Sequence, residues 1–262
     1  MYVFICENSI EGIFTGVYDA WASRYGHRNL RLTIEEPQTY ELFCEYIRVV
    51  PSPEKSQKIS RAVCNSFGRE VYQDICQAIM ATDTKKRHRL DKADCIYRTI
   101  LLGFAMHDGH QVLTALGEPY VARVFELARS TDREAHHLLG FLRFRQLKNG
   151  ILASTIHPKN DVLPILGEHF SDRLPQERFL IYDELHQTAV LHTPGAPFIL
   201  VDASGIRPEM MDDVSTEELQ FQRLWCTFFD SIAIEARRNP KLQSQNIPKR
   251  FWKDTVELQQ IR

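Results

Sequence analysis

Apolar residues recur along the chain at spacings that predict several distinct elements. The stretch "EGIFTGVYDAWASRY" has helical spacing, and one face of that helix collects Ile13, Phe14, Val17 and Trp21. The short runs "YVFIC", "RLTI" and "YIRVV" are rich in β-forming residues and predict strands. Residues 53–81 predict two helices, with a break near Phe67-Gly68.

The middle and the end of the chain continue this helical pattern. A long helix after "TDTKKRHRLDK" has a core stripe of Leu90, Ala93, Ile96, Tyr97, Ile100, Leu101 and Phe104. We expect further helices from about Pro119 to His137 and after "ND" at 160–161, where Asn160 or Asp161 would be the cap. Ser215 and Glu218 have capping-box spacing ahead of an apolar helix that contains Leu224, Trp225, Phe228, Phe229 and Ile232.

The stretch "LLGFLRFRQLKNGILASTIHPKN" predicts a β-hairpin around Asn149-Gly150, a dipeptide typical of a two-residue type I′ turn. That turn would place Arg145 opposite Ser154 and Arg143 opposite Ile156. Both faces of the hairpin would then carry apolar residues, so we expect cover on both sides of the sheet. "RFLIYDE", "TAVLHT" and "PFILVD" predict three more strands.

Together these elements predict an α+β fold. A mainly helical N-terminal lobe would be joined to an antiparallel sheet with flanking helices in the C-terminal part. We expect residues 1–84 to form an N-terminal strand and helix segment, and residues 85–262 to form an α+β domain that packs as one unit.

Composition narrows the class of protein. The 262 residues carry a formal net charge of −2, and no apolar run approaches the roughly 20 residues that span a bilayer. The N-terminus lacks the basic region of a secretory signal, so we expect a cytoplasmic protein with no membrane partner. Six scattered cysteines form no C-x-x-C pair, which predicts free thiols rather than a zinc or cluster site.

The motifs of common enzymes are missing from the sequence. It contains no G-x-S-x-G, no P-loop and no Gly-rich dinucleotide fingerprint. "HDGH" at 107–110 favours a surface turn over a metal site, and "GFLRF" lacks the basic and small residues of an RNA-recognition strand. We therefore expect no metal and no cofactor.

Basic residues gather in two places. Lys85, Lys86, Arg87 and Arg89 precede the long central helix, where the helix dipole disfavours cations. Lys249, Arg250 and Lys253 surround Phe251 and Trp252. Interleaved cations and aromatic rings suit phosphate contact with base stacking, but they equally suit aromatic anchors with lysines turned outward.

Three stretches carry a family resemblance: "YVFICENSIEGIFTGVYDAW", "HHLLGFLRFRQLKNGILASTIHPKNDVLPILGEHFSDRLPQERFLIYD" and "FFDSIAIEARRNPKLQSQNIPKRFWKD". They resemble the bacterial family called "probable DNA metabolism protein", whose biochemical activity is unknown. Members of that family occur beside a radical-SAM protein of the spore-photoproduct-lyase type, or are fused to a uracil-DNA-glycosylase-like domain. The resemblance therefore implies a partner of one of these two kinds. This chain has neither a C-x-x-x-C-x-x-C cluster motif nor a glycosylase motif.

The resemblance implies a DNA-binding accessory protein in DNA repair or modification, with DNA and a radical-SAM or glycosylase-like protein as partners. The residues expected to contact nucleic acid are Arg143, Arg145, Lys148, Arg173, Lys249, Arg250, Trp252 and Lys253. One alternative is a protein-interaction subunit that never touches DNA. Another is an undescribed hydrolase or glycosylase-like enzyme with the catalytic candidates His136, His169, Tyr182 and Asp183. Arg143, Arg145 and Arg173 could also simply pair with acids such as Asp183 or Glu177.

Overall fold

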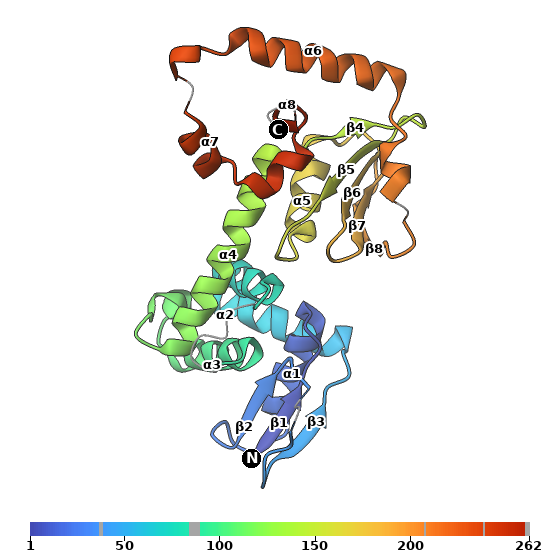
Figure 1. Cartoon of the computed structure of the whole chain (residues 1–262). Coiled ribbons are helices and arrows are strands. Elements are labelled where there is room, and N and C mark those ends of the chain that lie inside the picture. The colour runs from blue at the N-terminus through green and yellow to red at the C-terminus, as the bar shows by residue number, and fades with distance from the viewer. Residues whose placement is uncertain (37–38, 84–89, 207, 238, 260–262) are drawn as a thin grey trace. The chain divides into compact units, whose positions relative to one another are not determined.

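The computed structural model describes residues 1–36, 39–83, 90–206, 208–237 and 239–259 (Figure 1). It divides into two compact units, Met1–Asp132 and Arg133–Arg262, which are described separately. This division differs from the boundary expected at residue 84. The reason is that buried residues between 93 and 128 share one hydrophobic core with the N-terminal elements.

The first unit is built on a three-stranded parallel sheet in the order β2-β1-β3. The strands are β1 (Tyr2–Ile5), β2 (Leu30–Thr33) and β3 (Glu45–Arg48), each at a position that the sequence predicts. Helix α1 (Ile10–Ala22) begins at Ser9, whose side chain accepts from the Gly12 N–H. Its buried face packs with Phe4 and Leu32 in the core of the unit.

The rest of the first unit is helical, with α2 (Pro53–Met80), α3 (Lys92–Ala105), the 3-10 helix η2 (Gly109–Thr114) and the start of α4 (Pro119–Phe141). The predicted break in α2 is confirmed, since Gly68 has φ 84° and ψ 166°. Lys92 is buried, and its ammonium donates to the carbonyls of Ile79 and Ala81 at the end of α2. A cation at this end of a helix satisfies carbonyls that have no partner within the helix.

The second unit contains a five-stranded sheet in the order β4-β5-β6-β7-β8. The strands are β4 (Arg145–Gln146), β5 (Leu152–Ile156), β6 (Phe179–Asp183), β7 (Thr188–His192) and β8 (Ile199–Asp202). The predicted α+β class is confirmed, with 54% helix and 14% strand. Three of the four strand pairings are antiparallel as expected, but β5 and β6 are parallel. Helix α5 (Leu163–Arg173) connects these two strands, and such a crossover returns the chain in the same direction.

The predicted hairpin exists, but its register was wrong by one residue. Arg145 pairs with Ala153 rather than with Ser154. The loop has three residues, because the Leu147 N–H bonds to the Ile151 carbonyl and Gly150 closes a turn back to Leu147. Within this loop Gly150 alone takes a positive φ, of 81°, which fits a type I turn followed by a left-handed residue. Because of this shift of one residue, Arg145 lies on the same face of the sheet as Ala153, opposite to the face that the sequence predicts.

Both faces of this sheet are covered, as the mixed pattern predicts. One face packs Ile156, Phe179 and Ile181 against α5 and the end of α4. The other packs Ala153, Tyr182 and Ala189 against the segment around η3 (Pro208–Asp212). The arginine at 143 lies in neither strand, because α4 continues to Phe141 and the chain is irregular before β4.

The C-terminal segment contains α6 (Thr216–Ile232), η4 (Glu235–Arg237), α7 (Pro240–Asn246), η5 (Lys249–Asp254) and α8 (Val256–Gln259). Ser215 caps α6 as predicted, but Glu218 accepts from the Gln146 N–H of β4 instead of completing a capping box. The expected cap of α5 was wrong. Val162 stands at that position without a side-chain bond, because Asn160 is bound to Glu134. Among the described residues, no helix is both long and apolar enough to cross a bilayer.

Candidate functional site

Arg143 stabilises the fold of the second unit and does not project from the surface of a strand. Its guanidinium donates to the carbonyls of Gly140 and Leu142 at 3.0 and 3.3 Å, where α4 ends. The same side chain lies 3.0 Å from the buried carboxylate of Glu257 in α8. Arg143 therefore ties α4 to α8. It pairs with an acid, as the ion-pair alternative expects, but that acid is Glu257 and not Asp183 or Glu177.

Arg145 and Lys148 are paired with neighbouring acids at the outer edge of β4. Arg145 lies 3.4 Å from Asp212, and Lys148 lies 2.5 Å from Asp213. The backbone of the same acidic segment adds to the edge, since the Lys148 N–H donates to the Asp213 carbonyl. Exposed pairs of this kind contribute about 1 kcal/mol or less. Each acid also offsets a positive charge that phosphate contact would need.

Arg250 reaches into a buried polar cluster. Its guanidinium lies 2.9 Å from the carboxylate of Glu134, which is only 2% exposed. Glu134 also accepts from the backbone N–H groups of Lys159 and Asn160 and from the Asn160 side chain, at 2.8 to 3.0 Å. This carboxylate fixes the loop after β5, and Arg250 neutralises it.

The remaining predicted nucleic-acid contacts have different settings. Lys249 is exposed and lies 5.9 Å above the ring of Trp252, whose indole N–H donates to the Ile247 carbonyl. Phe251 is buried beside His137, as the anchoring alternative expects. Arg173 is exposed, and its side chain has no bonded partner among the residues that the structure describes. The side chain of Lys253, and the first basic cluster at 85–89, lie outside the described residues.

The structure does not bring the four catalytic candidates together. Tyr182 and Asp183 follow each other on β6 and point to opposite faces of the sheet. Tyr182 is buried in the apolar cluster around Ala153 and Ala189, whereas His136 is exposed on α4. His169 lies on α5 with its ring against the edge of Phe170. These positions do not form a shared catalytic site.

Asp183 instead shapes the turn after β6. Its buried carboxylate accepts from the backbone N–H groups of Leu185 and His186 and lies 2.6 Å from Nδ1 of His186. The hydrogen bond to Asp183 raises the pKa of His186, against the opposing effect of its own burial. Asp161 and Glu134 raise this pKa further. Carboxylates therefore surround the histidine at the carboxyl ends of β5 and β6, which favours its protonated form.

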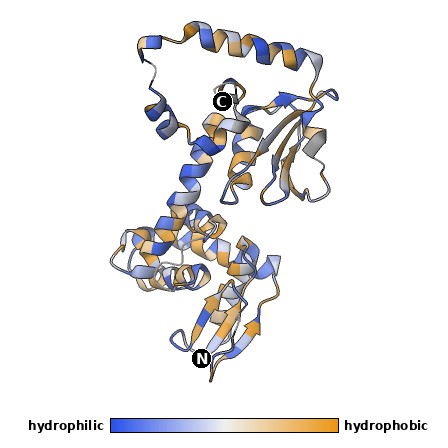
Figure 2. Cartoon of the chain, viewed as in Figure 1, coloured by the Kyte–Doolittle hydropathy of each residue, from blue (hydrophilic) through white to orange (hydrophobic). Residues whose placement is uncertain are grey.

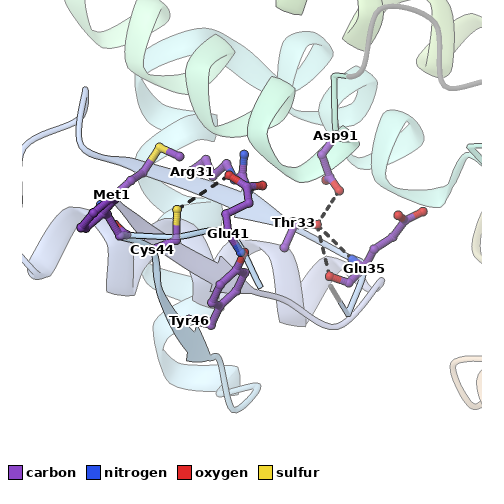
Figure 3. Close-up of polar contacts among 9 residues, drawn as sticks. Met1, Arg31, Thr33, Glu35, Glu41, Cys44, Tyr46 and Asp91 are labelled. Atoms are coloured by element: carbon purple, nitrogen blue, oxygen red, sulfur yellow. Dashed lines mark hydrogen bonds and ion pairs between the residues drawn. The ribbon is translucent and has the colours of Figure 1, made fainter. Parts of the chain in front are cut away.

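The first unit has an acidic hollow of about 720 Å³, which is lined by residues of the parallel sheet, of the loop after β2 and of the start of α3. Figure 3 shows Arg31 with Glu41 on one side, and Thr33 donating to Asp91 at 2.7 Å on the other. The pKa of Asp91 is raised, chiefly by burial of the carboxylate, and its hydrogen bonds offset part of this rise. Among the described residues, no group of three or more histidine, cysteine or acidic side chains has the arrangement of a metal site.

Helix α6 exposes a stripe of large apolar side chains, and this is the feature that sequence reasoning missed. Figure 2 shows apolar positions recurring along this helix. The stripe, here called the α6 stripe, consists of Phe221, Leu224, Trp225, Phe228 and Ile232, whose exposed fractions range from 44% to 67%. Only Cys226 of this helix is buried, with its thiol 4.0 Å from the Val256 carbonyl of α8. The helix therefore uses its other side for packing and leaves the wide apolar side uncovered.

The α6 stripe continues into a hollow of about 600 Å³ between the end of α6 and α7. Its apolar lining includes Phe229, Ile232, Ile234 and Leu242, and the last two are more than half exposed. Exposed apolar surface of this kind is typical of interaction sites on proteins. The sequence pattern could not distinguish it from a core-facing helix, because both have the same spacing.

Comparison with known proteins identifies a family and little beyond it. The domain described as "Domain of unknown function (DUF4130)" matches residues 90–257. No curated protein gives a significant match. A solved structure, the DHH domain of a member of a family of ribosomal proteins, aligns at 14% identity and a TM-score of 0.22, over 74% of this chain and 57% of that one. A likeness this low supports no argument. The chain therefore belongs to the DUF4130 family, which has no assigned function.

Proposed function

We propose that this protein is an accessory subunit that docks on a partner protein through the α6 stripe. The carrying observation is the exposure of five large apolar side chains at helical spacing on one side of α6. An amphipathic helix with anchors at i, i+3, i+4 and i+7 suits insertion into an apolar groove. The adjoining hollow against α7 would receive a bulky side chain of the partner.

The ion pairs of the basic residues also favour a protein partner over DNA. Arg143, Arg145, Lys148 and Arg250 each lie within 3.4 Å of an acid of the same chain. Phosphate contact would have to compete with these pairs, whereas nothing in the described residues competes for the α6 stripe.

The family resemblance of the sequence suggests the kind of partner. It points to a radical-SAM protein of a DNA-repair type, or to a glycosylase-like domain. In this proposal the partner performs the chemistry, and the present chain holds or positions it. The chain's place in DNA repair or modification rests on that resemblance.

The test is co-purification of the full-length protein with the radical-SAM protein. The double substitution Leu224→Glu with Phe228→Glu places two charges in the α6 stripe and should abolish the complex. The matched control is Gln220→Glu with Thr227→Glu, which adds the same charges to exposed positions on the polar side of the helix. The proposal fails if the stripe variant retains the partner as well as the control does.

DNA contact is a second candidate, favoured by one observation. Lys249 and Arg250 are both exposed on η5, and Lys249 lies over the partly buried ring of Trp252. Phosphate contact predicts that log affinity falls linearly with log salt, with a slope of about −0.9 per phosphate neutralised. Anisotropy of labelled DNA over a salt series measures that slope, and Lys249→Ala with Arg250→Ala should reduce it. Unchanged slopes in this variant would remove η5 from consideration.

A further inference from the structure

A second hollow of the first unit has a volume of about 640 Å³, and its lining residues all belong to that unit. It is formed by the end of α1, the loop that follows, the C-terminal half of α3 and the first turn of α4. Its lining includes Trp21, Arg28, Arg98, Leu101, Phe104 and Tyr120. The volume is within the range of about 300–1,000 Å³ typical of small-ligand pockets.

Two aromatic rings are exposed in this hollow, although the sequence pattern assigns both to core stripes. Trp21 is 45% exposed and Phe104 is 39% exposed. Their ring centroids are 5.7 Å apart in an edge-to-face arrangement, and the ring of His27 lies 5.2 Å from Trp21. His27 is held by a 2.7 Å contact between its Nδ1 and the Tyr97 hydroxyl. The rings thus form an aromatic wall that suits the stacking of a flat ligand.

Two arginines stand at the same hollow. Arg28 is exposed, and its side chain has no bonded partner within the part of the chain that the structure describes. Arg98 is held through its Nε, which donates to Asp94 at 2.6 Å. A guanidinium suits bidentate contact with phosphate. The hollow therefore combines an aromatic wall with a cation that no described residue neutralises.

We propose that this hollow binds a nucleotide unit, with the base against Trp21 and Phe104 and the phosphate at Arg28. Base stacking on aromatic side chains beside a positive charge is how single-stranded nucleic acids are held without sequence preference. A free mononucleotide would present the same chemistry. The inference goes beyond the docking role of the α6 stripe, because its residues belong to the other unit.

Binding to the full-length protein is measured with two probes. Fluorescence anisotropy follows a labelled oligo(dT) strand, and calorimetry follows unlabelled AMP and dTMP. Trp21→Ala should weaken binding about 10-fold or more, while Trp21→Phe should retain most of the affinity. Arg28→Ala should weaken binding and lessen its salt dependence, with little effect on folding because this side chain is exposed.

The probes and a second set of variants separate the outcomes. Tight binding of the oligonucleotide alone would identify a single strand as the source of the nucleotide unit, and equal binding of AMP would identify a free nucleotide. Trp225→Ala, in the other unit, should leave either affinity unchanged. The stripe variant of α6 should also bind nucleotide normally, so failure of the docking proposal would not affect this one. Affinities of Trp21→Ala and Arg28→Ala equal to the parent protein, or no binding of any probe, would overturn it.

Discussion

The guanidinium of Arg250 lies 2.9 Å from the carboxylate of Glu134, which joins the C-terminal η5 to the second half of α4. The arginine is 37% exposed in its side chain, whereas the glutamate is almost fully buried. The two partners therefore differ in burial, so their removal should have different effects on stability. Glu134 holds the loop at Lys159 and Asn160 through three further hydrogen bonds, and Arg250 closes the remaining side of the carboxylate.

Replacement of Glu134 by alanine should destabilise the protein by about 3 kcal/mol, because several hydrogen bonds to one buried charge are lost together. Arg250→Ala should cost only about 1 kcal/mol, since the carboxylate keeps its three N–H donors and the arginine is partly in solvent. Urea unfolding of both variants measures the difference. Equal losses would show that the ion pair, and not the loop, carries the stabilisation.

Stability should depend on pH through His186. Its pKa in the folded protein is raised above 6.5, chiefly by the hydrogen bond to Asp183. The stabilising contribution is therefore complete below about pH 6.5 and is lost as the pH rises through the folded pKa. His186→Gln should flatten this decline in a series of urea midpoints from about pH 5.5 to about pH 8.5.

His137 provides an internal comparison with the opposite sign. Burial, and the nearby charge of Arg250, lower its pKa. It therefore makes the protein less stable as the pH falls below about 6.5. The His186→Gln variant should still lose stability below about pH 6.5, because His137 is unchanged. If the substitution alters the stability only below that pH, the decline at higher pH does not come from His186.

Two glycine substitutions should have opposite effects. Gly150 has a φ of 81° in the hairpin loop, so Gly150→Ala should cost about 1 kcal/mol. Gly140 lies within α4, and a Cβ there would meet no atom within 4 Å. Gly140→Ala should stabilise the protein by roughly 0.5 kcal/mol or more through its helix propensity. Thermal unfolding of the two variants gives the signs directly.

Thiol reactivity should follow burial. Burial raises the pKa of Cys6 and of Cys95 to about 12, and that of Cys76 to about 11. Iodoacetamide reacts with the thiolate, so these three residues should be labelled only after unfolding. Cys44 and Cys64 are only partly buried and should react in the native protein. Mass spectrometry of peptides from native and unfolded samples identifies the labelled positions, and early labelling of Cys6 would contradict the burial.

Local signals in the sequence determined much of the secondary structure. The strands at "YVFIC" and "RFLIYDE", the break at Gly68 and the cap at Ser215 each depend on the backbone preferences of a few adjacent residues. Such preferences act within one or two turns of chain and are readable without a fold. The α+β class follows from the order of these elements.

The candidate sites were decided by tertiary structure, because they depend on partners remote in sequence. The sequence showed that Arg143 and Arg145 were charged, but not that Glu257 and Asp212 would neutralise them. It placed Trp21 and Trp225 on apolar faces, but helical spacing is the same whether a face meets the core or solvent. Only the packing of other elements leaves those two rings exposed, because burial depends on what covers a face and not on the residues that form it.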